Sequence, residues 1–363
     1  MKRDPLAIAR RTLTMYQPML RRSVDASERA ALVDFQRLVF GRHAYQHRQN
    51  FHTWLYESGF AEICFAKDGE EVVGQQGAIG CNVQVGDEIL KGCFAIDLHV
   101  RDDWKMKGLG VALTASLLES YDLVMGVGIS EDAIAMYRRL GWHDLGQVSY
   151  WMLITSLAGV PINANESLFR KIKKYLWTAF ALSRLKLTGY TRDKATLEKC
   201  TQFEQWHAEV LNANAASCHE LWTVEKLNWR YQSSQYVCFS VREANELAGF
   251  VVLRLEQAGH LQIWHICEFA AMQSENVSSM VGALSRQALL HGIARIVFCG
   301  RDMGLESNLK KHTFVHRDHG GRWMIHCRKS ELHDVVSSSN CWALSGAASD
   351  SDFHAIFTGA DPE

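Results

Sequence analysis

The pattern of apolar and polar positions predicts the same succession of elements twice along the chain. Between residues 15 and 154 it predicts a short strand, two helices, three antiparallel strands, a helix, a strand, a second helix and one long closing strand at 142–154. From residue 195 to residue 330 a similar order returns. Antiparallel strands combined with helical crossovers predict a mixed sheet covered by helices. The predicted fold class is therefore α/β in the broad sense, with an α+β mixed sheet.

A single spacing relates the two halves, so we interpret the second half as a copy of the first. Residues at equivalent points of the pattern are 172 positions apart: Gly110 and Gly282, Gly128 and Gly300, Trp142 and Phe314. This spacing predicts four segments. They are an N-terminal domain at 1–154, a basic linker at 155–194, a C-terminal domain at 195–330 and a tail at 331–363.

The stretch at 93–142 contains a candidate binding loop. An apolar strand leads into the loop KMKGLG at 105–110, and a helix follows the loop directly. The first N–H groups of a helix lack partners within the helix, and the helix dipole is positive there, so this loop is suited to hold a phosphate. In the second half Met280 replaces Gly108, and both loop lysines are missing. We therefore expect the second half to be degenerate and to bind no polyphosphate.

Three short motifs give this stretch a resemblance to a known family. The loop KMKGLG follows VRDDW at 100–104, the pattern SxxAxxxY occupies 130–137, and LGW closes the unit at 140–142. Together they resemble the GNAT (Gcn5-related N-acetyltransferase) superfamily, whose loop reads Arg/Gln-x-x-Gly-x-Gly/Ala and whose later motif begins with Asn. This chain has Lys105 and Ser130 at those two first positions. The resemblance implies two acyl-CoA N-acyltransferase-like (GNAT) domains in tandem, the second one degenerate.

The resemblance also implies a cosubstrate and a set of site residues. The cosubstrate is acetyl-CoA or another acyl-CoA, and no metal is expected. Tyr137 would protonate the leaving thiolate, and a strand N–H would polarise the thioester carbonyl. Asp97 or His99, which alternate on the strand and so share a face, would take the proton from the amine. The residues expected to bind the cosubstrate are Leu98, Val100, Lys105, Lys107, Gly108, Leu109, Gly110, Val111 and Ser130.

The expected reaction is transfer of an acyl group to the amine of a small molecule, with an amino sugar of surface polysaccharide synthesis as one candidate acceptor. Two other functions stay open. A protein with the same doubled architecture could transfer an aminoacyl group from tRNA to a cell-wall peptide, or the chain could bind CoA without catalysis. The net charge of −1, from 39 basic and 40 acidic residues, argues against nucleic acid as a partner.

Composition predicts a cytoplasmic protein. The ten cysteines lie mostly in apolar runs and never as CxxC, which is typical of reduced core thiols. His312, His316 and His319 span a predicted strand and its turn without a cysteine or carboxylate at ligand spacing, so we interpret them as solvated loop residues. The N-terminal segment has no sustained apolar core and predicts no signal peptide.

The linker contains a basic amphipathic segment at 168–187, with no acidic residue between Glu166 and Asp193. Two interpretations stay open for this segment: peripheral contact with an anionic membrane surface, or a solvated helix that bridges the two domains. No apolar run in the sequence reaches the roughly 18 residues of a membrane span.

Two aromatic features outside the loop predict core packing. In the run NWRY at 228–231, we expect Trp229 and Tyr231 to be buried on either side of a surface Arg230. In the tail, Trp342 and Phe353 are expected to pack back on the C-terminal domain.

Overall fold

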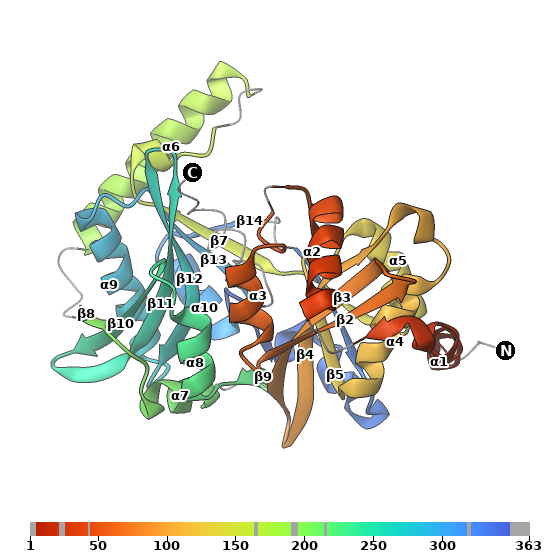
Figure 1. Cartoon of the computed structure of the whole chain (residues 1–363). Coiled ribbons are helices and arrows are strands. Elements are labelled where there is room, and N and C mark those ends of the chain that lie inside the picture. Colours follow the sequence, from red (N-terminus) through yellow and green to blue (C-terminus); the bar gives the residue numbers. More distant parts are fainter. Residues whose placement is uncertain are drawn as a thin grey trace.

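The computed structural model describes residues 5–21, 26–42, 44–162, 166–189, 195–213, 216–317 and 321–348. It contains two mixed sheets that lie side by side and carry helices on their faces (Figure 1). The first sheet has the order β1 (Leu20–Arg21), β2 (Ala61–Asp68), β3 (Glu71–Val85), β4 (Glu88–Val100), β5 (Leu123–Val127), β15 (Arg322–Cys327), β6 (His143–Gln147). Strand β9 (Cys218–Leu221) also pairs with β3, and β16 (Trp342–Ala343) pairs with β9. The second sheet has the order β14 (Val315–Arg317), β7 (Ser149–Ile154), β13 (Arg295–Gly300), β12 (Leu261–Ala271), β11 (Glu246–Ala258), β10 (Tyr236–Glu243), β8 (Thr196–Cys200).

The helices in the described residues lie mostly on the faces of the two sheets, as the sequence predicts (Figure 1). They are α1 (Pro5–Tyr16), α2 (Ala26–Phe40), α3 (Gln49–Tyr56), α4 (Leu109–Ser120), α5 (Glu131–Arg139), α6 (Leu168–Gly189), α7 (Gln205–Asn212), α8 (Val224–Tyr231), α9 (Asn276–Leu290), α10 (Met303–Lys311) and α11 (His333–Val336). The doubled order of elements is confirmed, since α10 follows α5 by 172 residues at both ends and β13 begins 172 residues after β5.

The repeat is broken at one point, the start of the long helix after the central strand. Helix α4 begins at Leu109, whereas α9 begins at Asn276, five residues before the position equivalent to Leu109. The second-half counterparts of Gly108 and the residues after it therefore lie inside α9, where backbone N–H groups bond to carbonyls four residues earlier. The open loop of the first half has no equivalent in the second.

The two halves exchange their last strands. Strand β7 leaves the first half and lies between β13 and β14 of the second sheet, while β15 of the second half lies between β5 and β6 of the first. The prediction of one long strand at 142–154 is therefore wrong, because the chain passes from one sheet to the other at Val148. The apolar pattern is the same before and after Val148, so the sequence does not indicate that the chain changes sheets there.

The exchanged strand β15 is held by core packing and by one ionic cluster. Trp323, Met324 and Ile325 are almost fully buried, and burial of each such side chain contributes about 1.5–3 kcal/mol. At the start of β15, Arg322 donates through Nε to Asp144 Oδ1 of β6 at 2.8 Å and through its second nitrogen to Oδ2. These contacts fix β15 against its neighbour in the first sheet.

Helices cover both faces of the first sheet. Apolar residues of α1, α4 and α5 pack on one face, and those of α2 and α3 pack on the other. Helix α8 of the second half joins α3 through Trp54 and Trp229, whose rings stack at 5.1 Å and whose indole N–H groups donate to each other's backbone carbonyls. Trp229 and Tyr231 are buried as predicted, but Arg230 is buried too, with only 4% exposed, and donates to the Ala347 carbonyl at 2.7 Å.

Helix α6 projects from the second half, as Figure 1 shows at the top of the view. None of the helices in the described ranges combines the length and apolar character needed to cross a bilayer. In the tail, Trp342 packs edge to face on Trp323 and is 2% exposed, as predicted. Phe353 lies outside the described residues, as does His319.

Candidate active site

The central feature of the site is a strand edge that its neighbour leaves unpaired. Strand β4 pairs in parallel with β5 only where residues 92–94 meet residues 123–125, yet β4 continues to Val100. On its other side β4 stays paired with β3 as far as Val100. Among the described strands, none pairs with residues 95–100 on the β5 side. The backbone groups along this edge can therefore bond to a ligand.

A bulge deforms β4 within this unpaired stretch. The register with β3 shifts between Ile96 and His99, so that three steps along β4 match two steps along β3. Asp97, inside the bulge, has φ of +49°, a left-handed conformation that is costly for a residue with a Cβ. Bulges and residues of this conformation are common at functional sites, where they redirect backbone and side-chain groups.

The loop at 105–110 turns into α4 through two left-handed residues. Met106 has φ of +63°, and Gly108, the residue before the helix, has φ of +91°. No side chain caps α4, so its first N–H groups have no partner from a capping residue. Alternating handedness in such a loop turns successive N–H groups toward a common point, a geometry that binds anions.

Helix α1 supports this loop from behind, a role that the sequence did not indicate. The Tyr16 hydroxyl donates to the Lys107 carbonyl at 2.5 Å, and the Tyr16 ring packs edge to face on Trp104. A Cβ added at Gly108 would lie 3.3 Å from Thr12 Cγ2. The loop is therefore held closely against α1, and both this contact and the φ of +91° favour glycine at position 108.

The two loop lysines lie in different surroundings. Lys105 Nζ pairs with Asp102 at 2.6 Å, and both side chains are mostly exposed. Lys107 Nζ lies 4.7 Å from the centre of the Trp104 ring. Arg101, directly before this segment, is already engaged with Asp103 and Glu71. Because exposed ion pairs contribute little, Lys105 can leave Asp102 for an incoming phosphate at small cost.

The other predicted binding residues lie next to the loop. Leu98 and Val100 pack with Leu109 of α4, and a Cβ at Gly110 would meet Val100 Cγ2 at 3.7 Å. Ser130 is the N-cap of α5, where its hydroxyl accepts from the Ala133 N–H at 3.4 Å.

Tyr137 belongs to the buried face of α5, near the point where β4 and β5 separate. Its ring stacks on Trp142 at 4.3 Å and belongs to the same apolar cluster as Cys93 and Val124, a pair just before the strands part. Burial raises the pKa of Tyr137 to about 12, opposed by hydrogen bonding with the side chains of Gln76 and Thr114. The phenol is thus fully protonated at neutral pH.

Asp97 and His99 lie toward the opposite face, where α2 and the segment after it cover the sheet. Gln46 Nε2 donates to Asp97 Oδ1 at 3.1 Å. The His99 ring packs edge to face on Phe35 and Phe40 of α2. Burial, aided by the charge of Lys105, lowers the pKa of His99, so its imidazole is neutral at neutral pH.

A chain of buried polar side chains lies behind the bulge. His52 Nε2 bonds to Gln36 Oε1 at 2.7 Å, Gln36 Nε2 donates to Gln75 Oε1 at 3.0 Å, and Gln75 Nε2 reaches the Asp97 carbonyl at 3.5 Å. Burial lowers the pKa of His52. We did not predict this chain, although the polar pair Gln75-Gln76 inside an apolar strand was an available signal.

In the second half, the corresponding strand edge is covered by the chain itself. Strand β12 pairs with β13 over residues 263–266 and then continues to Ala271. The segment after β16 lies against this continuation, where the Ser345 hydroxyl and the Gly346 N–H both donate to the Cys267 carbonyl at 2.9 Å. Only the first half combines an uncovered strand edge with an open loop, within the described residues.

Comparisons with known proteins identify the fold. No family model and no curated protein matches the sequence. A probable N-acyltransferase from Enterococcus faecalis V583 is similar over 86% of this chain and 73% of its own, with a TM-score of 0.59 and 9% identity. A GCN5-related N-acetyltransferase from Kribbella flavida covers the same shares, with a TM-score of 0.58 and 14% identity.

A third solved structure extends the likeness to a different acyltransferase. The N-myristoyltransferase of Saccharomyces cerevisiae, solved with bound myristoyl-CoA, is similar over 85% of this chain and 82% of its own, with a TM-score of 0.53 and 11% identity. At these identities the likeness concerns the fold alone, and it extends over both halves of the chain. The chain therefore has the fold of these acyltransferases, with the separated strands β4 and β5 and the loop before α4 in its first half.

Proposed function

We propose that this protein is an acyl-CoA-dependent N-acyltransferase whose active site lies in the first half. The observation that carries the proposal is the uncovered edge of β4 beside the uncapped N-terminus of α4. The unpaired edge of β4 can form backbone hydrogen bonds to an extended pantetheine arm, and the N-terminus of α4 can bind the pyrophosphate. Acetyl-CoA is the first cosubstrate to test.

Different residues around the loop would bind different parts of the cosubstrate. Backbone N–H groups from Lys107 to Val111 would hold the pyrophosphate, with Lys105 and Lys107 adding positive charge. Leu98 and Val100 would bond to the pantetheine arm through their backbone and shape its apolar side. Ser130 acts on the structure of α5 as its N-cap and supports this arrangement indirectly.

In the reaction, the amine nitrogen attacks the thioester carbon and the carbon–sulfur bond breaks. A backbone N–H of the β4 bulge would stabilise the oxyanion that forms on the carbonyl. His99 or Asp97 would accept the amine proton, and Tyr137 would give a proton to the departing thiolate. A neutral His99 is competent as a base, and a protonated Tyr137 is competent as a donor.

The acceptor that fits best is a small polar amine. On the face that carries Asp97 and His99, His99 packs on aromatic rings, but Asp97 contacts polar side chains, namely Gln46 and the buried chain that begins at His52. Such a surface favours a hydroxylated amine, for example an amino sugar of polysaccharide synthesis, over an alkyl amine. We place the reaction in the cytoplasm, since the ten cysteines are all free thiols.

The test is a titration of the purified protein with acetyl-CoA, followed by an assay of free thiol against a panel of amino sugars, amino acids and polyamines. Binding at micromolar affinity together with thiol release on one amine class is the expected result. Failure to bind acetyl-CoA or longer acyl-CoA would overturn the proposal.

A second candidate is a CoA-binding protein without catalysis, favoured by the complete burial of Tyr137. In that case the titration gives binding, and no amine gives turnover. Transfer from aminoacyl-tRNA, the other alternative, is tested by incubating the protein with charged tRNA and a cell-wall peptide. The near-zero net charge makes this outcome the least expected.

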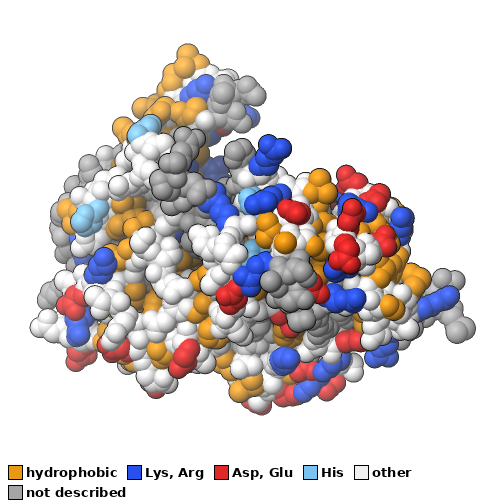
Figure 2. All heavy atoms as spheres, viewed as in Figure 1, with side chains coloured by type: hydrophobic (Ala, Val, Ile, Leu, Met, Phe, Trp, Pro, Cys, Tyr) orange, Lys and Arg blue, Asp and Glu red, His pale blue; other side chains and the backbone are white. Residues whose placement is uncertain are grey.

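We also propose that α6 brings the enzyme to an anionic membrane surface. Its exposed face carries large apolar side chains, with Phe169 77%, Leu176 67% and Phe180 68% exposed. Figure 2 shows apolar and basic side chains together on this projecting helix. Exposed apolar groups would enter the interface, and each lysine or arginine near an anionic leaflet adds about 1 kcal/mol.

Vesicle sedimentation tests this surface directly. The protein is expected to sediment with vesicles that contain phosphatidylserine and to stay in solution with phosphatidylcholine alone. Replacing Phe169 and Phe180 by Asp should abolish sedimentation, whereas the same change at Leu290, an exposed leucine of α9, should not. Equal sedimentation of all variants would contradict the assignment to α6.

A further inference from the structure

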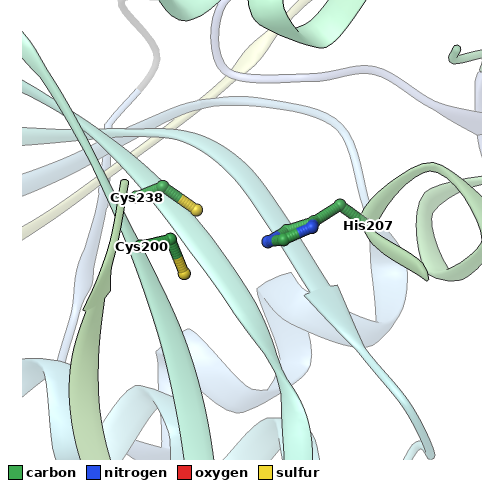
Figure 3. Close-up of side chains that lie close together, drawn as sticks. All are labelled: Cys200, His207 and Cys238. Carbon is green, nitrogen blue, oxygen red and sulfur yellow. The ribbon is translucent and has the colours of Figure 1, made fainter. Parts of the chain in front are cut away.

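Three potential metal ligands converge in the second half, away from the proposed acyl-transfer site. They are Cys200 at the end of β8, His207 in the first turns of α7 and Cys238 in β10. Figure 3 shows the two sulfur atoms side by side and the imidazole directed toward them. One ligand atom from each residue lies within 4.8 Å of the other two.

The strand pairing fixes the two thiols relative to each other. Cys200 and Cys238 are directly opposite in the antiparallel ladder of β8 and β10. Their side chains therefore project from the same face of the sheet. Cys238 is buried, and Cys200 is partly exposed, so one side of the cluster can be reached from solvent.

His207 is held in place by contacts that leave one ring nitrogen unused. Its ring is 2% exposed and stacks on Trp206 at 3.6 Å. Nδ1 lies 3.0 Å from the Glu204 N–H and 3.3 Å from the Glu204 carbonyl, so it has a partner in either tautomer. Nε2, buried and on the side of the thiols, has no hydrogen-bond partner outside the cluster.

A buried ring nitrogen without a partner is costly in an apolar core, and a bound cation removes that cost. Metal-binding histidines commonly donate their second N–H to a backbone carbonyl, which is the arrangement that Nδ1 and the Glu204 carbonyl allow. Two thiols and one imidazole are ligands for zinc and for other soft or borderline cations.

We propose that Cys200, His207 and Cys238 form a binding site for a zinc-type cation. The fourth position would be filled by water or by the Ser240 hydroxyl, which lies 2.8 Å from Cys200 Sγ. Zinc accepts this three-ligand set with one exchangeable position. A cation bound here would overturn our expectation that the protein holds no metal, and the proposal is independent of the acyl-transfer proposal.

The site would connect α7 to two strands, β8 and β10, that already pair with each other. Strand β8 is the edge strand of the second sheet and follows the α6 segment, while α7 packs outside that sheet. A cation held by one residue from each of β8, α7 and β10 would fasten the edge strand and the helix to the sheet. Loss of the cation should therefore loosen this corner of the second sheet and leave the chemistry of the first half unchanged.

The test uses the full-length reduced protein, stripped of metal and titrated with Co²⁺. The expected result is one equivalent bound, with sulfur-to-cobalt charge-transfer absorption, displaced by Zn²⁺. Cys200→Ser and Cys238→Ser should each remove the charge-transfer signal or halve it. Cys299→Ser, at another partly buried cysteine of the same sheet, should leave it intact. His207→Gln should weaken binding by more than the roughly 10–100-fold that loss of an outer-shell partner costs.

A second measurement does not depend on variants that fold. Alkylation of the wild-type protein, mapped by mass spectrometry, should show Cys200 and Cys238 protected by Zn²⁺ and no change at Cys299. Absence of stoichiometric binding, binding that survives both serine variants, or protection at other cysteines would each overturn the proposal. A Cys200–Cys238 disulfide in the isolated protein, with no metal binding after reduction, would do the same and identify a redox pair instead.

Discussion

Gly108 has a backbone conformation that its counterpart in the second half does not need. With φ of +91° it ends the loop and leaves the first N–H groups of α4 open, whereas Met280 lies within the helix α9 and is 1% exposed. Glycine at this position therefore accompanies the proposed anion site in the first half, and methionine accompanies its absence in the second half.

Gly108→Ala is expected to weaken acetyl-CoA binding at least about tenfold, a loss of 1.4 kcal/mol. The new Cβ would be forced into a left-handed conformation and pressed 3.3 Å from Thr12 Cγ2. Calorimetric titration measures the change. Gly69→Ala is the control, since Gly69 has φ of +60° in an exposed turn with nothing near its Cβ position. Equal binding by both variants would contradict the role of the loop.

Tyr137→Phe should lower kcat by about 100-fold or more, the usual contribution of a general acid, with little change in KM for acetyl-CoA. The measurement is a steady-state thiol-release assay. Tyr121→Phe provides the control, because Tyr121 is a buried tyrosine of the same apolar cluster whose hydroxyl donates to Glu62. If both variants keep full turnover, Tyr137 is a packing residue.

If His99 is the base, kcat/KM should fall at acidic pH with an apparent pKa below 6.5, because burial and Lys105 lower the pKa of this imidazole. The neutral, active form then persists below pH 6.5 and is lost as the pH falls further. His99→Gln should remove this limb, and exposed His260→Gln should keep it. A limb that survives in His99→Gln would favour Asp97.

Single residues also show where sequence reasoning succeeded and where it could not. The glycine pattern indicated the loop because left-handed turns demand glycine. Arg230 was expected at the surface, since arginine is rarely buried, but it is buried and donates to a backbone carbonyl from the far end of the chain. The cluster of Cys200, His207 and Cys238 has no recognisable spacing, because strand pairing rather than sequence proximity assembles it.

At the scale of elements, β6 and β15 depend on one carboxylate. Asp144 accepts two bonds from Arg322, one from Arg138 at 2.7 Å and one from the Gly146 N–H at 3.0 Å. The Arg322 guanidinium, followed by Arg138 and the Gly146 N–H, lowers the pKa of Asp144 to about 2. A carboxyl with a lowered pKa stabilises the fold above its unfolded pKa of about 4 and loses that effect as the pH falls toward 2.

Asp144→Asn should therefore cost about 1–3 kcal/mol of unfolding free energy at pH 7. The difference from wild type should stay constant between pH 5 and 8 and shrink below about pH 4, near the unfolded pKa of the carboxyl. Denaturant unfolding at several pH values measures it. Asp87→Asn, in the exposed turn between β3 and β4, should have little effect at any pH. A pH-independent loss in Asp144→Asn would show that packing, not charge, is responsible.

The order of elements could be predicted from sequence, but the partner of each closing strand could not. Periodicity and turn residues report on the local environment, and both β7 and β15 are apolar strands wherever they pair. Which sheet receives them depends on contacts between residues about 140 to 205 positions apart. The covered strand edge in the second half has the same origin, since the covering segment comes from the tail.

At the scale of the whole molecule, the exchange makes the two halves one folding unit. A fragment of residues 1–154 would lack β15 and would carry β7 without β13 or β14. We expect it to be largely unfolded or insoluble when produced alone. Its production together with residues 155–363 should restore a soluble complex, as judged by size-exclusion chromatography and circular dichroism. A stable, folded 1–154 fragment would contradict this view.

The exchange of β7 and β15 between the two sheets also affects how the nascent chain folds during synthesis. Strands β5 and β6 leave the ribosome long before β15, which is encoded about 175 codons after β6. At about 5–20 residues per second, β5 and β6 wait roughly 10–35 s for the strand that joins them. During that interval β5 has an unpaired edge and β6 has no partner strand, and an exposed edge is a template for pairing with other chains. The yield of this protein in a cell should therefore depend on elongation rate and on chaperones that shield the first sheet until residue 327 has been made.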